Sequence, residues 1–277
     1  MSAVRRVNSG PLGGQLAKLA LFKNPNEESV VAKQQAKRQR TRKAVILISF
    51  LLFPIILNYF SPYVIIDGAS QGIINGSFIV FVLLFLSSLF LGRLWCAWLC
   101  PAAGLQEACF AINAQPARGG RFDWIKWGIW IPWVSIIVIM AISAGGYQAV
   151  NFFHLTDSGI SVDQPFAYIT YYAVVGTFLT LSLTTGRRGG CHYICWMAPF
   201  MIIGRKTRNL VKWPALRLVA DRDKCIDCKS CTKNCPMSLD VNAMVQRREM
   251  ENSECILCGS CVDVCPKDVI AYSFRAG

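Results

Sequence analysis

Four long apolar stretches, separated by shorter polar segments, dominate the middle of the chain. They cover residues 44–66, 74–92, 125–149 and 166–185. Each has or approaches the roughly 20 residues that an α-helix needs to cross about 30 Å of hydrocarbon. The pattern therefore predicts four transmembrane helices. Pro54 and Pro132 are expected to kink the first and third of them.

The basic residues lie on one side of these four predicted helices. All 29 Lys and Arg residues precede the first helix, follow the fourth, or lie between the second helix and the start of the third. The other two connecting segments contain Asp67, Asp157 and Asp163 instead. Positive charge marks the cytoplasmic side of a membrane protein. We therefore expect a multi-pass protein of the cytoplasmic (inner) membrane with both termini in the cytoplasm, and this topology explains the formal charge of +13 without nucleic acid.

The first apolar stretch follows a long basic segment, longer than the n-region of a secretory signal peptide. We therefore expect that stretch to be retained as a membrane helix. The predicted organisation has three parts: a flexible basic cytoplasmic tail (1–43), a four-helix membrane domain (44–203) and a cytoplasmic C-terminal domain (204–277).

The C-terminal domain contains eight cysteines in two copies of one pattern. Each copy reads C-x2-C-x2-C-x3-C-P, the spacing found in bacterial two-cluster ferredoxins, in which the fourth cysteine binds the other cluster. The pattern predicts two [4Fe-4S] clusters. The expected ligands of one are Cys225, Cys228, Cys231 and Cys265, and those of the other are Cys255, Cys258, Cys261 and Cys235. Structural zinc is the alternative, which two complete sets of four thiols disfavour.

A second kind of cysteine motif follows the second and fourth predicted helices. Both copies contain Gly-Arg and then C-x3-C, and their cysteines are Cys96, Cys100, Cys191 and Cys195. The repeat predicts two helical hairpins in the same orientation, which would bring both pairs to one depth on the inner side. On a helix, the spacing places each pair on one face. These thiols could hold an additional Fe–S or metal centre, act as redox-active thiols, or pack as small residues, as expected for Cys109.

Three further residues are candidates for proton or quinone chemistry. His154, in the outer segment with Asp157, Asp163 and Tyr168, could contact a quinone headgroup. Glu107 is a candidate proton acceptor on the inner side, and His192 could tune the adjacent thiols. The two histidines are predicted at opposite faces, which disfavours a b-type haem. The chain has no C-x2-C-H, dinucleotide-binding or P-loop motif.

The order of these elements resembles the NapH family of membrane quinol dehydrogenase subunits. The wider group includes the membrane part of NosR and the copper-reducing CcoG proteins. The resemblance, over roughly residues 40–270, implies electron exchange between the quinone pool and a redox partner, with the four membrane cysteines and eight C-terminal cysteines as functional residues. Family members often have proline directly after both C-x3-C motifs, whereas here Cys195 is followed by Trp196. A sister group with a different partner is therefore indicated.

We expect an all-α membrane domain of two parallel-repeat hairpins and a small α+β ferredoxin domain with two [4Fe-4S] clusters. Its expected function is electron exchange between lipid quinone and a partner complex, in which the substrate reaction is completed. The alternatives are a cysteine-based reductase of metal ions or disulfides and a maturation factor for a partner redox enzyme. Residue patterns leave the electron direction, the quinone type and the oligomeric state open.

Overall fold

The computed structural model describes residues 25–156, 159–162 and 164–276. Over these residues the chain is mostly helical, with two small two-stranded sheets. Thr41–Gly277 form one compact unit, and Met1–Arg40 form another. The predicted tail over residues 1–24, together with Asp157 and Asp163, lies outside the described residues. The domain boundaries at 43/44 and 203/204 stay predictions.

Two helices are long and apolar enough to cross a membrane. They are α8 (Ile125–Ser143), extended by the 3₁₀ helix η3 (Gly120–Trp124), and α9 (Pro165–Thr185). Lys37–Leu51 and Phe53–Phe60 make a third candidate if this pair, bent by 60°, is one span. Helix α5 (Gly76–Leu91) is apolar but has 16 residues, fewer than a full span needs. Length and composition thus support two or three spans among the described residues.

The first apolar stretch bends by 60° beside Pro54, where a kink was predicted, but it does not continue as one helix to residue 66. Helix α2 (Pro25–Leu51) is followed by α3 (Phe53–Ile56), the 3₁₀ helix η1 (Leu57–Phe60) and α4 (Pro62–Ser70). Pro54 and Pro62 lie in the first turns of α3 and α4, where the missing N–H leaves no helical hydrogen bond unmade. Ser61 caps α4 by accepting a bond from the Val64 N–H. Proline therefore starts new helices here.

The structure also replaces part of the predicted flexible tail with helix. Helix α2 begins at Pro25, well before the first predicted span at residue 44. The sequence from Glu27 to Lys43 is polar and rich in residues with high helix propensity, such as Lys, Gln and Ala. A helix that continues from a polar segment into an apolar one has no single amphipathic face, which is why periodicity did not reveal it.

Two segments that are far apart in the chain pair beside the ends of α4, α5 and α8. Strands β1 (Ile73–Asn75) and β2 (Ala149–Asn151) are parallel. The buried Asn75 caps α5, with its Oδ1 accepting from the Phe78 N–H at 2.9 Å. His154 Nε2 lies 2.7 Å from Asp67 Oδ2. These contacts join the two connecting segments that were predicted on the outer side.

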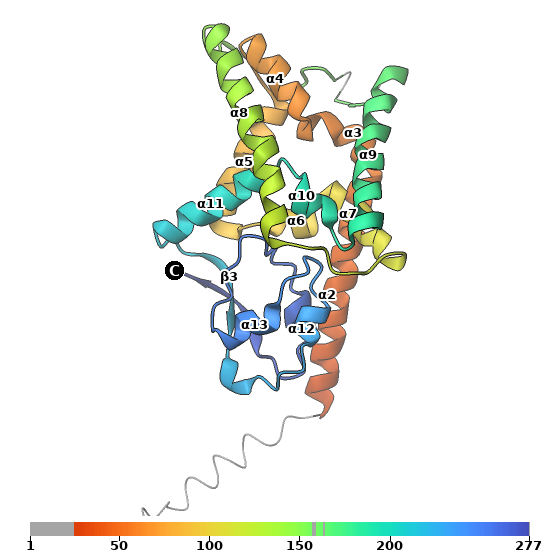
Figure 1. Ribbon diagram of the computed structural model, residues 1–277, viewed down its shortest axis with the longest axis vertical. Helices are drawn as coiled ribbons and strands as arrows, with labels where there is room; N and C mark the ends of the chain where they lie inside the picture. The colour runs from red at the N-terminus through yellow and green to blue at the C-terminus, as the bar shows by residue number, and fades with distance from the viewer. Residues whose placement is uncertain (1–24, 157–158, 163, 277) are drawn as a thin grey trace, which may run out of the picture. The chain divides into compact units, whose positions relative to one another are not determined.

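Short helices lie between the apolar helices and the C-terminal part of the chain (Figure 1). They are α6 (Leu94–Trp98), α7 (Pro101–Ala108) and α10 (Gly189–Tyr193). Gly92 and Gly186 end α5 and α9 with φ values of 59° and 94°, which favour glycine and let the chain turn sharply. Helix α11 (Ala198–Leu210) packs against α5, and α9 packs against α7 and α10.

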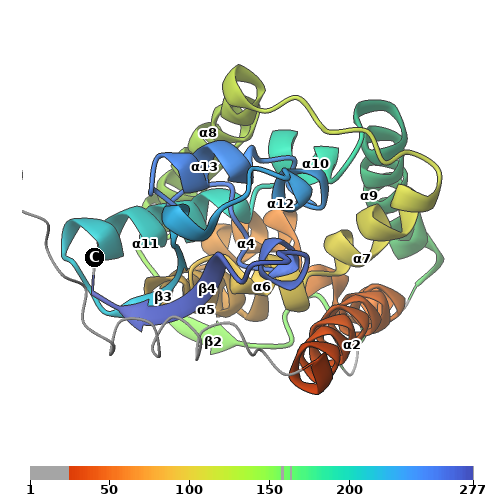
Figure 2. The same cartoon turned by 90° about the horizontal axis from the view of Figure 1, so that it is seen from below.

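The C-terminal part consists of one antiparallel sheet and several short helices. Strands β3 (Ala215–Ala220) and β4 (Ile270–Arg275) pair along their whole length (Figure 2). Between them in the chain lie the 3₁₀ helix η4 (Arg222–Lys224), α12 (Ser230–Lys233), α13 (Val241–Gln246) and α14 (Ser260–Asp263). Figure 1 shows α12 and α13 below the level of α6 and α10. One hydrophobic core continues from this part into the apolar helices.

Candidate iron–sulfur sites and the interface between them

Two small cavities in the C-terminal part are each lined by four cysteines. Cys225, Cys228, Cys231 and Cys265 line one, and Cys235, Cys255, Cys258 and Cys261 line the other. Each cavity therefore contains three cysteines of one motif and the fourth of the other, the crossed arrangement expected for two cubanes. The remaining lining residues are mostly apolar, which suits a centre shielded from water. The donor set fits [4Fe-4S], and ligation itself stays a prediction.

The backbone around the two cavities repeats with an offset of 30 residues. Matching residues with positive φ are Asp227 and Leu257, Lys229 and Gly259, and Ser238 and Asp268. Only one of these is glycine, and the left-handed region is unfavourable for the other residue types. The turns must therefore be held by their surroundings. They let each short loop present several thiols to one cavity.

Burial raises the pKa of several thiols at the cavity that contains Cys258. Burial raises the pKa of the Cys235 thiol to about 12, and the nearby Cys258 thiol raises it further. The pKa of Cys261 is raised well above its usual value for the same reasons, first burial and then neighbouring thiols. A metal ion supplies the positive charge that makes such thiols ionise. These shifts are typical of a metal-ligating set.

The four membrane cysteines lie close together in one buried core. They are Cys96, Cys100, Cys191 and Cys195. Burial raises the pKa of Cys100, and the charges of the other three thiols raise it further. The prediction that each pair shares a helix face is wrong, because α6 and α10 end before the second cysteine. Cys100 is extended, with φ −72° and ψ 121°.

Proline has an equivalent position in both copies of the membrane motif. Pro101 is in the first turn of α7, directly after Cys100. Pro199 is in the first turn of α11, four residues after Cys195. Both prolines start the helix that follows the cysteine loop, a position that proline favours. The departure from the C-P pattern thus lengthens the loop between Cys195 and α11, and proline still lies in the first turn of the helix that follows.

Arg93 is fully buried beside the membrane cysteines, and only part of its guanidinium group has partners. Its Nη1 donates to Glu254 Oε2 at 2.9 Å and to the Ser253 carbonyl at 2.8 Å. Its Nε and Nη2 have no hydrogen-bond partner within the described part of the chain. The charge of Arg93 acts on Cys96 and Cys195. Unpaired buried donors are costly, and metal-bound sulfur in this site would be an acceptor for them.

Glu107 forms a buried ion pair with two arginines. Arg42 donates to both of its oxygens, at 2.8 and 2.7 Å, and Arg188 Nε donates to Oε1 at 3.1 Å. Burial by itself would raise the pKa of Glu107, but the two arginines lower it to about 2. A carboxylate that stays ionised near neutral pH is a poor proton acceptor. Both carboxylate oxygens of Glu107 are occupied by arginines, and the proton-acceptor role stays a prediction.

The buried charges near the membrane cysteines do not cancel. Four side chains are cationic, namely Arg42, Arg93, Lys126 and Arg188, and two are anionic, Glu107 and Glu254. The Lys126 ammonium lies 2.6 Å from Glu254 Oε1. The Asp123 carboxylate, which lies near Glu254 and pairs with His192, offsets part of this excess, and burying the remaining positive charge uncompensated is unfavourable. Four thiolates around a divalent ion or a [4Fe-4S]²⁺ core carry two negative charges, so the thiols and these cations fit such a centre.

His192 bridges α10 and the C-terminal part. Its Nδ1 lies 2.7 Å from Asp123 Oδ1, and its Nε2 lies 3.1 Å from the Met237 carbonyl. Ligand atoms of Asp123, His192 and Glu254 lie within 4.8 Å of one another. A metal ion there would be repelled by Lys126, which already pairs with Glu254. His192 therefore acts as a structural link next to Cys191.

One buried region joins the membrane cysteines to the cavity that contains Cys258. The charge of Arg188 acts on both Cys191 and Cys258. Gln106 Nε2 donates to Cys191 Sγ at 3.1 Å, and Arg205 donates to the Cys255 carbonyl at 2.7 Å. Sequence reasoning missed Arg93, Gln106 and Arg205, because their partners are distant in the chain. The one local signal was an arginine just before each C-x3-C.

Two family models match the regions that contain these sites. Residues 217–266 match a family described as "4Fe-4S dicluster domain". Residues 76–114 match a family described as "4Fe-4S binding domain", and this range includes Cys96 and Cys100. The first match covers all eight cysteines of the two C-terminal motifs.

Two curated proteins are similar to this chain. "Putative electron transport protein YccM" of Escherichia coli K12 is 24% identical over 68% of this chain and 54% of its own length. The chain thus spans about half the length of that relative. "Uncharacterized protein MJ0749" of Methanocaldococcus jannaschii is 23% identical over 75% of this chain and 74% of its own length. No solved structure matches. The two family matches and the similarity to the Escherichia coli protein support iron–sulfur electron transfer.

Proposed function

We propose that this protein is a membrane subunit that exchanges electrons between a lipid quinone and a redox partner. In this proposal it has four spans as two hairpins of the same orientation, and both termini lie in the cytoplasm of the inner membrane. The resemblance to NapH-type subunits and the apolar helices support the proposal. The substrate reaction of the complex would be completed by the partner protein.

The observation that carries the proposal is the arrangement of three sets of four thiols. Two sets line cavities in the C-terminal part, and the third lies in the same buried core between the apolar helices. Clusters held at these sites would accept and donate single electrons. A soluble ferredoxin needs only the first two sets. The third set, placed toward the apolar helices, supports electron exchange with a molecule in the membrane.

The residues of the interface have defined roles in this proposal. Arg93, Lys126 and Glu254 hold the C-terminal part against α8 and exclude water between the sites. Arg42, Glu107 and Arg188 hold α2, α7 and the loop before α10 together beside the membrane cysteines. Their net positive charge favours anionic thiolate centres and raises their reduction potentials. A site of this kind is rigid, which keeps the reorganisation energy of electron transfer small.

An iron inventory and a quinol titration test the function. Anaerobically purified protein is expected to contain more iron and acid-labile sulfide than two cubanes require, and decylubiquinol or menadiol is expected to bleach its visible absorption. Cys96→Ser and Cys191→Ser should lower the iron content and abolish bleaching by quinol but not by dithionite. Bleaching by dithionite alone in the wild-type protein would overturn the quinone proposal. Turnover of added disulfide or metal ions would then support a cysteine-based reductase.

A further inference from the structure

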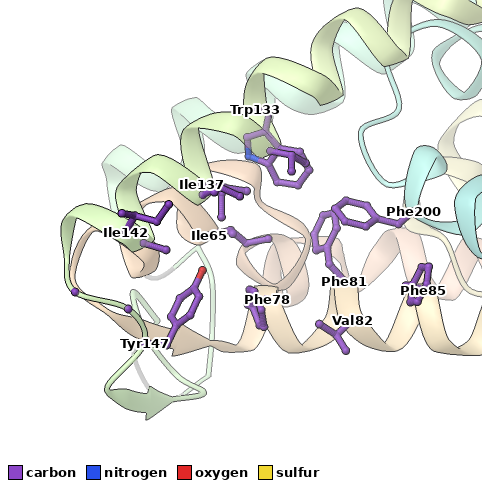
Figure 3. A pocket seen from close by; sticks show the side chains of 15 residues that line it. Ile65, Phe78, Phe81, Val82, Phe85, Trp133, Ile137, Ile142, Tyr147 and Phe200 are labelled. Carbon is purple, nitrogen blue, oxygen red and sulfur yellow. The ribbon is translucent and has the colours of Figure 1, made fainter.

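An apolar cavity lies between α4, α5 and α8, and none of the cysteines that the structure describes lines it. Its volume is about 700 Å³, within the range of typical small-molecule sites. Ile65, Phe78, Phe81, Trp133 and Phe200 are among the lining residues, and the lining ends at Gly145, Gly146 and Tyr147 beside β2 (Figure 3). The cavity is partly open at the side, so a lipid-soluble molecule could enter from the membrane.

One end of the cavity lies next to the membrane cysteines. Phe200 forms edge-to-face contacts with Phe81 and Trp133, at centroid distances of 5.2 and 5.8 Å. The next residue on α11 is Met201, whose Sδ lies 3.9 Å from Cys96 Sγ. Phe200 in the cavity wall is thus followed on α11 by the residue that contacts a thiol of the membrane site.

The other end of the cavity offers one polar side chain. Tyr147 packs against Phe78 with ring centroids 5.3 Å apart. Figure 3 shows its hydroxyl group directed toward the space between Ile65 and Ile137. Within the described residues, this hydroxyl has no hydrogen-bond partner, whereas the other polar group of the lining, Trp133 Nε1, donates to the Pro62 carbonyl at 3.0 Å. An occupant with an oxygen acceptor or donor would satisfy it.

We propose that this cavity is the quinone site, with the ring oxygen bonded to Tyr147 and the ring and first isoprenoid units against the aromatic wall. This inference rests on the proposed function. The occupant must be apolar over most of its length, carry an oxygen that bonds to Tyr147 and exchange electrons with the membrane cysteines through the aromatic wall. A lipid quinone has all three properties. A phospholipid acyl chain, which also ends in an ester oxygen, lacks the third, and His154 and Tyr168 do not line the cavity.

Filling the cavity tests the site. Ala141 lines the cavity on α8, and Ile139 on the same helix is exposed and does not line it. Ala141→Phe should weaken binding of decylubiquinone by at least tenfold, because the added ring occupies the space of the quinone. Ile139→Phe, the matched control, should bind it like the wild type. Quenching of intrinsic tryptophan fluorescence measures binding, since Trp133 lies in the wall, and an unchanged iron content shows that each variant folds.

Removing the Tyr147 hydroxyl group gives a second measurement that does not fill the cavity. Tyr147→Phe should weaken binding of decylubiquinone by about 3- to 10-fold, as expected for one lost hydrogen bond, with little change for decylbenzene. Equal affinity of wild type, Ala141→Phe and Tyr147→Phe would overturn the site. Competition by phosphatidylglycerol as effective as that by quinone would also overturn it and assign the cavity to an acyl chain.

The failures of the site and of the function can be told apart. If decylubiquinol bleaches the clusters equally in wild type and in Ala141→Phe, quinol reacts elsewhere and only the assignment of the cavity fails. If decylubiquinol bleaches neither protein although dithionite bleaches both, the quinone function itself fails. Bleaching that is fast in the wild type and in Ile139→Phe but slow in Ala141→Phe supports both proposals.

Discussion

Arg93 shows how one side chain connects the different parts of this protein. It follows the glycine that ends α5, precedes the first membrane cysteine, and binds Glu254 just before the second C-terminal motif. Two of its donor nitrogens lack a partner among the described residues and lie near thiols. A lysine could form the ion pair but could not present the remaining planar donors. The chemistry of guanidinium therefore matters at this position.

Replacing Arg93 should change the membrane centre more than the fold. Arg93→Lys keeps the charge and the bond to Glu254 but removes the free N–H donors, so the reduction potential should fall by on the order of 50–100 mV. The reason is that hydrogen bonds to sulfur favour the reduced, more negative centre. Redox titration monitored by EPR measures the shift. An unchanged potential with unchanged iron content would show that the donors do not contact the centre, and Arg187→Lys is the control.

Glu107 should support stability and have no role in proton transfer. Glu107→Gln leaves Arg42 and Arg188 without a counter-charge and should cost about 3–5 kcal/mol of unfolding free energy. The folded pKa of Glu107 is about 2, below its usual value of 4.5. Its contribution is therefore complete above about pH 4.5 and is lost as the pH falls toward 2. Thermal unfolding from pH 3 to 8 measures this, with exposed Glu249→Gln as control. A change in the pH–rate profile of quinol oxidation near neutral pH would contradict it.

The two cysteine motifs of the C-terminal part act as one element, because each supplies a ligand to the cavity of the other. Helices α12 and α14 start at equivalent positions, and the residues with positive φ match in both copies. The short helices α6 and α10 form a comparable pair in the membrane part. In both pairs the functional geometry requires two copies of the element. A single membrane motif has two thiols, and a single C-terminal motif has four but places only three of them at its own cavity.

Exchanging one cysteine should identify the crossed ligands. Cys265→Ser should alter the same cluster as Cys228→Ser, because both residues line the cavity of the first motif. It should leave the cluster altered by Cys258→Ser intact. EPR and Mössbauer spectra of the three variants, together with their iron content, make the comparison. Complete loss of one cluster would lower the iron content by about four atoms per protein. Cys109→Ser, outside all three sets, serves as control. Spectra of Cys265→Ser that match those of Cys258→Ser would contradict the crossing.

At the scale of the whole molecule, the C-terminal part and the apolar helices share one compact unit from Thr41 onward. Buried ion pairs and a continuous core join them, unlike the polar, separable contact typical of two independent domains. This arrangement keeps the distances between the three sets of thiols fixed. It also implies that the side of the membrane that carries α6 and α10 carries the C-terminal part.

Reporter fusions should reveal the proposed topology. Alkaline phosphatase fused after Gln71 or Asn151 is expected to be active, because these positions follow an odd number of proposed spans. Fusions after Ala117 or Leu210 should be inactive, and fluorescent protein at the same positions should show the opposite pattern. The basic residues near those inner positions are the physical reason. An active phosphatase after Leu210 would place the C-terminal part outside and contradict the topology.

The sequence by itself determined the features that depend on local spacing. Three thiols of a cubane come from one short loop, so the cysteine spacing alone predicts the C-terminal motifs and their crossed fourth ligands. The lengths of the apolar stretches likewise predict which segments are candidates to cross a membrane. Only the tertiary structure decided the rest. The first apolar stretch broke because capping and packing favoured new helices at Pro54 and Pro62. Arg93 meets Glu254 across 161 positions, and Tyr147 reaches a cavity formed by α4, α5 and α8. Such contacts arise when distant segments bury their apolar faces together, and no local pattern records them.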